Sequence, residues 1–341
     1  MNKRYSYLDF LRCLAIFFVV VLHVVTPVLT NTGLYGSTSW YLCLFQNSLN
    51  RAGVPLFLMI SGFLMLRDER TRDVGSFYKK RLPRLVLPLA VWNGIYYVGY
   101  ALQGGEAISP VTYLRQLLNN GSAYHFWFVY TLLGIYLIAP FLKRIVDAAG
   151  VKEQIILLVI VMFPGAIRPW LNMAGPIYIF LFDPLMESYI GYFLLGYLLG
   201  SQNLNKKLRI GVYLGGVAGF LIGSVGNLVT ASPEGIPLPF NMAYGMNHYL
   251  CAGAIFVLVK TFFEKHEAGL ARLEKPLATL SGLVFGVYWV HVAVLELVSG
   301  FLSGDMPLPL LLVQETFLTL VLSLGVSWVI SKIPGVQKCL L

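Results

Sequence analysis

Apolar segments long enough to cross a lipid bilayer follow one another along almost the whole of this chain. A transmembrane helix takes roughly 20 apolar residues to cross about 30 Å of hydrocarbon. Backbone groups in lipid must find hydrogen-bond partners within their own segment, so each segment is expected to be a helix. The sequence therefore predicts an all-α integral membrane protein, a bundle of about ten transmembrane helices. The predicted spans are 7–29, 43–66, 85–103, 124–142, 154–170, 177–200, 210–230, 244–263, 279–302 and 309–331.

Charged residues are too scarce for a soluble protein. They make up 12% of the chain, whereas a soluble domain carries about 25%, because its surface faces water. The longest polar stretch, residues 67–84, has only the length of a loop. We therefore expect residues 1–341 to form a single transmembrane domain with no soluble domain, whose chemistry is built from helix interiors and short loops.

Lysine and arginine are distributed very unevenly between the two sides of the predicted bundle. These residues concentrate in cytoplasmic loops of membrane proteins. If the N-terminus is cytoplasmic, every Lys and Arg except Arg51, Arg115 and Arg168 falls on the inner side. This predicts that both termini are cytoplasmic. The net charge of +9 then reflects topology and attraction to anionic headgroups, so no nucleic-acid partner is predicted. The four cysteines have no zinc or redox spacing, and no metal site is predicted.

The first predicted helix carries three polar residues at membrane depth, Asp9, Arg12 and His23. Residues eleven positions apart lie on nearly the same face of a helix, about 16 Å apart along its axis. Asp9 precedes Arg12 by one turn and can pair with it. Polar side chains in lipid are costly and are candidates for function. The alternative is a snorkelling arginine together with a histidine that hydrogen-bonds to a neighbouring helix.

A second group of candidates is basic and lies before the third predicted span. Lys80, Arg81 and Arg84 belong to the segment FYKKRLPRLVLPL. The tendency of cytoplasmic loops to be positive predicts some of these charges. An Arg-x-x-Arg pair at the start of a helix also places two guanidinium groups on adjacent turns, an arrangement suited to phosphate. The pair therefore predicts a site for the phosphates of a nucleotide or coenzyme.

The ninth predicted span places Tyr288 and His291 within the membrane. The rise from Thr279 to His291 is about 18 Å, so His291 lies at a depth similar to that of His23. Two histidines at one level of a bundle indicate a shared role more than unrelated packing. His291 is therefore the second candidate for acid–base chemistry.

The remaining candidates lie in the fourth and sixth predicted spans. His125 and Trp127 open the fourth span, where aromatic residues usually mark the membrane interface. Position alone thus predicts an interfacial His125, not a catalytic one. Asp183 and Glu187 lie one turn apart in the outer half of the sixth span. Two buried carboxylates would raise each other's pKa, as in proton-handling or acceptor-binding sites, and a wet vestibule is the alternative.

Taken together, these residues resemble the acyltransferase 3 family of membrane acyltransferases, whose hallmark is an Arg followed eleven positions later by a His in the first helix. The resemblance is to its stand-alone members that O-acetylate envelope polysaccharide precursors, the enterobacterial common antigen acetyltransferase among them. The matching motifs run in order along nearly the whole chain: Arg12 to His23, Gly53–Phe63, Arg81-x-x-Arg84, His125-x-Trp127, Phe193-Leu-Leu-Gly196 and Tyr288-x-x-His291.

The resemblance implies transfer of an acyl group, usually acetyl from acetyl-CoA, to a hydroxyl of a glycan or lipid-linked sugar. It also implies a multi-pass protein of the bacterial cytoplasmic membrane whose partners are acyl-CoA, the acceptor and the bilayer. The basic cluster Lys80, Arg81 and Arg84 would hold the coenzyme phosphates. His23 would be the general base, because imidazole titrates near neutral pH. Arg12 would bind a phosphate or the oxyanion.

Within this hypothesis, the other polar residues would support the base or hold the acceptor, namely Asp9, Tyr288, Asp183, Glu187 and Trp127. Two other classes of protein stay open. A secondary transporter also has many helices with polar groups at mid-membrane, but it usually carries paired internal repeats, which are not apparent here. A non-catalytic glycan exporter is the second alternative. Turnover of acyl-CoA separates an enzyme from both.

Overall fold

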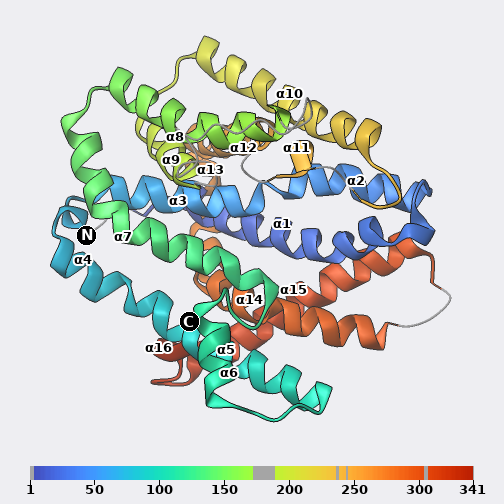
Figure 1. Ribbon diagram of the computed structural model, residues 1–341. Helices are drawn as coiled ribbons and strands as arrows, with labels where there is room; N and C mark the ends of the chain where they lie inside the picture. The colour runs from blue at the N-terminus through green and yellow to red at the C-terminus, as the bar shows by residue number, and fades with distance from the viewer. Residues whose placement is uncertain (1–3, 172–188, 236–237, 243–244, 303–305, 341) are drawn as a thin grey trace.

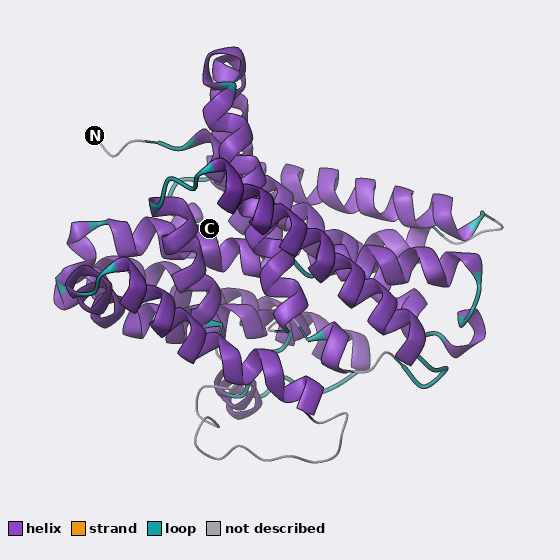
Figure 2. Ribbon diagram, turned by 90° about the horizontal axis from the view of Figure 1, so that it is seen from above, coloured by secondary structure: helices purple, strands orange, loops and turns teal. Residues whose placement is uncertain are grey.

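The described part of the molecule is built from helices and loops. In the computed structural model, no strand occurs among the described residues (Figure 2). These are residues 4–171, 189–235, 238–242, 245–302 and 306–340. Eight helical segments of this part are long and apolar enough to cross a membrane. The protein is therefore an all-α integral membrane protein, as the sequence predicts.

The eight segments coincide with eight of the ten predicted spans. Four are single helices: α1 (Ser6–Thr30), α10 (Lys206–Thr230), α12 (Met246–Lys265) and α15 (Leu308–Lys332). Four are composite: α2 with α3 (Thr38–Asn50, Gly53–Arg67), α4 with α5 (Val74–Arg81, Pro83–Gly104), η3 with α7 (Tyr124–Phe126, Trp127–Ala148), and α13 and η6 with α14 (Glu267–Leu270, Ala271–Leu273, Glu274–Phe301).

The other two predicted spans are also helical where they are described. The fifth corresponds to α8 (Val151–Leu171), and the described end of the sixth is α9 (Ile190–Ser201). The first residues predicted for the sixth span lie outside the described residues. The remaining elements are short: η1 (Thr32–Leu34), η2 (Glu69–Arg72), α6 (Pro110–Leu118), α11 (Leu238–Asn241) and α16 (Gln337–Leu340).

The second span differs from its prediction, because it is not one continuous helix. It breaks at Arg51 into α2 and α3, which follow one another across the molecule (Figure 1). Pro55 lies four residues after Arg51 and has no backbone N–H, so the Arg51 carbonyl has no helical donor. The sequence contains this proline, but a hydropathy pattern alone does not register the break.

The centre of the bundle is made by α1, α3, α7 and α14. Helix α1 packs against α2, α3 and α14, and α3 packs against α7 and α9 (Figure 1). Glycines allow the closest of these approaches. A Cβ atom on Gly62 of α3 would collide with the backbone of Phe193 in α9, and one on Gly196 would collide with the backbone of Met59. Small residues at such crossings let transmembrane helices pack tightly without a hydrophobic driving force.

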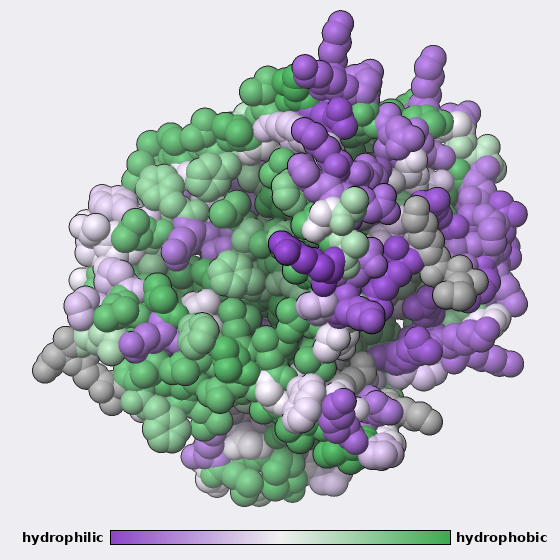
Figure 3. Space-filling model, turned by 180° about the vertical axis from the view of Figure 1, so that it is seen from behind, coloured by the Kyte–Doolittle hydropathy of each residue, from purple (hydrophilic) through white to green (hydrophobic). Residues whose placement is uncertain are grey.

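Polar and apolar surfaces are separated along the bundle. Apolar residues cover much of the face in Figure 3, and hydrophilic residues gather at the end where the N-terminus and α4 lie. The C-terminus lies toward the same end in Figure 1, and the end of α14 and the start of α15 lie at the opposite end. The two ends of the bundle therefore present different surfaces, and only the polar one carries the basic segment 79–84.

Candidate functional site

A cavity of about 810 Å³ opens at the polar end and runs between α1, α3, α5, α7 and α14. Ligand sites of proteins are typically about 300–1,000 Å³, mostly apolar, with a few polar groups that orient the ligand. This cavity fits that description. Its walls are Tyr5, Arg12, Phe57, Ile60, Ser61, Phe63, Leu64, Met65, Arg67, Asp68, Glu69, Arg81, Arg84, Leu85, Phe128, Leu132, Tyr136, Ser281, Val284, Phe285 and Tyr288.

Three arginines surround the mouth of this cavity. Arg81 and Arg84 come from the junction of α4 and α5, and Arg67 ends α3. None of the three forms an ion pair with a carboxylate among the described residues. Lys80 is exposed and lines a smaller adjoining pocket together with Arg81 and Arg84. The mouth is thus a cationic site with unused donors, suited to phosphate.

Two acidic residues that directly follow α3, Asp68 and Glu69, also line the cavity, but both already pair with other residues. Asp68 accepts hydrogen bonds from Arg70, at 2.7 Å from Nη2, and this holds the pKa of Asp68 below its ordinary value. Glu69 pairs with Lys143 at 2.8 Å. Because these carboxylates are engaged, they leave the positive charge at the mouth of the cavity largely uncompensated.

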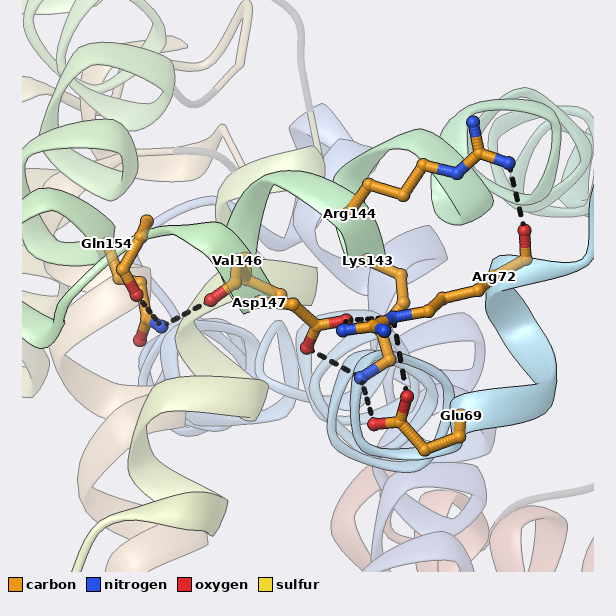
Figure 4. Close-up of polar contacts among 8 residues, drawn as sticks. Glu69, Arg72, Lys143, Arg144, Val146, Asp147 and Gln154 are labelled. Atoms are coloured by element: carbon orange, nitrogen blue, oxygen red, sulfur yellow. Dashed lines mark hydrogen bonds and ion pairs between the residues drawn. The ribbon is translucent and has the colours of Figure 1, made fainter.

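A charged network fixes the loop to the end of α7, as Figure 4 shows. Lys143 is 2% exposed and contacts both Glu69 and Asp147, the latter at 2.6 Å. Arg72 adds a second contact to Asp147 at 2.7 Å, and Arg144 donates to the Arg72 carbonyl. Ion pairs that share partners in a network hold geometry better than isolated surface pairs. This network therefore positions η2 beside the cavity.

Arg12 lies deeper, where it lines the cavity from α1. Its Nη1 donates to Asp9 at 2.9 Å and to Ser281 of α14 at 3.3 Å. Asp9 is 2% exposed and also accepts from Arg4 at 2.7 Å and from Ser281 at 2.8 Å. The structure thus contains the predicted pairing of Asp9 with Arg12. Asp9 compensates the charge of Arg12 and fixes its direction.

Three histidine rings meet beyond the inner end of the cavity. The ring centroids of His23 (α1) and His291 (α14) are 5.2 Å apart, and those of His125 (η3) and His291 are 5.1 Å apart. His125 and His291 are fully buried, whereas His23 is partly exposed. Within the described parts of the chain, no group of three His, Cys, Asp or Glu side chains is placed to bind a metal ion.

His291 has one nitrogen engaged and one available. Its Nδ1 lies 2.7 Å from the carbonyl oxygen of Tyr288, and an oxygen of that kind only accepts, so Nδ1 carries the proton. Its Nε2 is buried without a hydrogen-bonding partner among the described residues. The free lone pair therefore sits on Nε2. A basic nitrogen with no internal partner is available to a proton donor that enters the site.

Tyr288 joins the cavity to the histidines. Its ring lines the cavity and lies 6.0 Å from the ring of His291, and its hydroxyl donates to the His125 carbonyl at 2.6 Å. Phe128 and Phe285 pack against Tyr288 at the same end. The cavity therefore ends on an aromatic wall, and His23 and His291 lie behind it, not in its lining.

The structure brings together most, but not all, of the residues that the sequence singles out. Trp127 does not line the cavity and contacts Tyr189, with ring centroids 5.3 Å apart. Asp183 and Glu187 lie outside the described residues. His125, expected at the interface, is buried against His291, and Arg67 joins the cationic mouth. The burial of His125 and the place of Arg67 at the cavity both depend on contacts between distant segments, which local sequence patterns do not encode.

Comparison with known proteins identifies relatives of the chain. A family model described as an acyltransferase domain matches residues 5–332. The succinoglycan biosynthesis protein ExoH of Rhizobium meliloti (strain 1021) is 32% identical over 103 residues, which are 28% of this chain and 27% of that protein. The match thus covers about a quarter of that relative's length. No solved structure matches the chain.

Proposed function

The chain belongs to this acyltransferase family, and from that premise we propose that it moves an acetyl group from cytosolic acetyl-CoA to a hydroxyl of a cell-envelope glycan or lipid-linked sugar. The observation that supports this most is a single cavity whose mouth is cationic and whose inner wall adjoins a histidine cluster. Coenzyme A has the matching polarity, with phosphates at one end and a thioester at the end of a long arm.

In this proposal the donor enters from the mouth of the cavity. Arg81 and Arg84 bind its phosphates with help from Arg67, and Lys80 lies close enough to add charge. The apolar walls hold the pantetheine arm. Arg12 is about 16 Å from His23 along one helix, too far to hold an oxyanion beside that histidine. Arg12 is therefore assigned to the donor, and Asp9 and Ser281 orient it.

The transfer step needs a base on the acceptor side of the thioester. The acceptor hydroxyl oxygen attacks the thioester carbon, the new C–O bond forms, and the C–S bond breaks. The hydroxyl proton passes to an imidazole, and the departing thiolate takes up a proton. His23 is assigned as the base because it is partly exposed while His291 is fully buried. His291 and Tyr288 then support the ring of His23 and the thioester.

The proposal extends to the setting of the reaction. The whole chain acts as one transmembrane domain in the bacterial cytoplasmic membrane, with the cationic mouth facing the cytosol, where acetyl-CoA is found. The positive-inside distribution of Lys and Arg supports this orientation. An acceptor that carries a sugar is supported by the similarity to a protein named for succinoglycan biosynthesis.

Purified protein incubated with acetyl-labelled acetyl-CoA and envelope glycan extracts tests the proposal. The expected result is label on a glycan hydroxyl, released by mild alkali as an ester is, together with one equivalent of free coenzyme A. A variant that lacks Arg81 and Arg84 gives the matched background. If the glycan stays unlabelled and acetyl-CoA is neither bound nor consumed, the chain is not an acetyl-CoA-dependent transferase.

A further inference from the structure

Arg51 is a cation near the middle of the second span, at the break between α2 and α3. At this break, Pro55 cannot donate a backbone hydrogen bond to the Arg51 carbonyl. Irregular backbone at membrane depth is tolerated where it is buried in protein or borders a polar space. Arg51 thus lies at an irregular point inside the span, not at a helix end near water.

The guanidinium of Arg51 has no anionic partner among the residues that the structure describes. No ion pair or side-chain hydrogen bond of Arg51 occurs among the described residues, and its Nε is buried without a partner. Arg12, another arginine at membrane depth, is compensated by Asp9. The Arg51 side chain as a whole is partly exposed, and a cation at membrane depth without an ion pair is costly and commonly marks a substrate or ion site.

Arg51 lies outside the lining of the donor cavity, near the level of His23 on α1. Gly53, two residues later, packs against Ala15 and Val19 of α1, and His23 is one turn beyond Val19. Helix α3 runs from Gly53 toward the polar end (Figure 1), so Arg51 lies beyond Gly53 in the direction of His23, and its charge acts on the ring of His23. Arg51 does not line the donor cavity.

Aromatic rings border the same place. Tyr189 lies within electrostatic range of Arg51, and its ring contacts Trp127 at 5.3 Å. Both rings are partly exposed. Sites for small polar ligands commonly combine such aromatic surfaces with a few fixed polar groups. Arg51 is thus within electrostatic range of Tyr189 and of the assigned base His23, and none of these three residues lines the donor cavity.

We propose that Arg51 binds an anionic group of the acceptor, a carboxylate or a phosphate, and thereby places the acceptor hydroxyl at His23. This inference rests on the proposed function, since it assigns the acceptor side of the same site. A planar guanidinium binds either oxyanion through two parallel hydrogen bonds. The carboxylate would belong to an acidic sugar, and the phosphate to the carrier of a lipid-linked sugar.

Binding measurements on purified Arg51→Met and Arg51→Lys variants test this. The probes are a glucuronate-containing tetrasaccharide, a neutral glucose tetrasaccharide and farnesyl phosphate. The wild-type protein is expected to bind one anionic probe more tightly than the neutral one. Arg51→Met should weaken the binding of that anionic probe about 10- to 100-fold. Arg51→Lys should retain part of the preference. Which anionic probe responds separates an acidic sugar from a carrier phosphate.

Arg115→Met in α6 is the matched control, because Arg115 is exposed and is also predicted on the outer side. It should leave binding unchanged. Acetyl-CoA binding and turnover, measured on the same preparations, report on the proposed function separately. The role of Arg51 is wrong if the wild-type protein binds the anionic and neutral probes equally. It is also wrong if Arg51→Met keeps the wild-type preference for the anionic probe, even if acetyl-CoA is consumed.

Thermal unfolding of the ligand-free variants gives a second, independent outcome. Arg51 has no ion pair among the described residues, so Arg51→Met should melt at the same temperature as the wild type or higher. Arg115→Met should not change the melting temperature. A marked fall in the melting temperature of Arg51→Met, or its failure to fold, would show that the guanidinium has structural partners, which contradicts the proposal.

Discussion

The ring of His23 on the first transmembrane helix lies 5.2 Å from the ring of His291 on α14, near the other end of the chain. The two helices pack along each other, so this proximity is part of the core of the bundle. Tyr288, one turn before His291, extends from the same place to the wall of the cationic cavity. Tyr288 therefore lies between the histidine pair, which includes the proposed base, and the cavity assigned to acetyl-CoA.

Replacing Arg84 by Ala should weaken acetyl-CoA binding about 10- to 100-fold, because a charge-assisted contact to phosphate is removed. Arg81→Ala and Arg67→Ala should act in the same direction, and Arg84→Lys should not restore full affinity if the contact is bidentate. Isothermal titration with acetyl-CoA measures the effect. Lys207→Ala, an exposed lysine of α10, is the control. Wild-type affinity in an Arg81→Ala, Arg84→Ala protein would reduce these arginines to signals of membrane orientation.

The topology predicts opposite labelling at two engineered cysteines. In a cysteine-free background, Lys79→Cys in the basic segment should resist a membrane-impermeant thiol reagent on intact cells, and Glu234→Cys should react. Both positions are exposed, so neither result reflects burial. Glu234 is preferred to Gly235 because that glycine has a φ of 145°. Labelling of Lys79→Cys from outside would reverse the orientation and separate the cationic mouth from cytosolic acetyl-CoA.

Close packing of α3 on α9 makes Gly62→Ala destabilising. Its new Cβ would overlap the Phe193 backbone, and overpacking of this kind costs about 1–3 kcal/mol or more. Gly134→Ala in α7 has open space around it and should be neutral or stabilising, by up to about 1 kcal/mol. Thermal unfolding in one detergent compares the two variants. Equal melting temperatures would mean that the helices separate more easily than their contact indicates.

Lys143→Ala should destabilise the protein by about 1–3 kcal/mol, since it removes a buried ammonium group that holds Glu69 and Asp147. Because the same contacts position η2 beside the cavity, acetyl-CoA affinity should also fall. Lys152→Ala, an exposed lysine at the start of α8, should stay within about 0.5 kcal/mol of wild type. A Lys143→Ala protein with wild-type stability and affinity would show that the network in Figure 4 holds nothing in place.

The helices and the polar residues of α1 and α14 can be predicted from the sequence because hydropathy and helical spacing are local. The burial of His125 cannot be, since it depends on how η3 meets α14. The break at Arg51 cannot be predicted from Pro55 alone, because the first turn of a helix also tolerates proline. The assignment of Arg12 to the donor depends on the cavity, whose lining comes from helices spread along the chain from α1 to α14.

Acetyl transfer by His23→Ala tests the central claim most directly. It should be measured with labelled acetyl-CoA and the glycan acceptor, beside wild type and His291→Ala at matched abundance and melting temperature. A general base contributes about 10²–10⁴-fold to a rate, so His23→Ala should lose activity by that order while binding acetyl-CoA as wild type does. Near-normal turnover by His23→Ala with an inactive His291→Ala would move the base to His291. Near-normal turnover by both variants would contradict a histidine-based transfer in this protein.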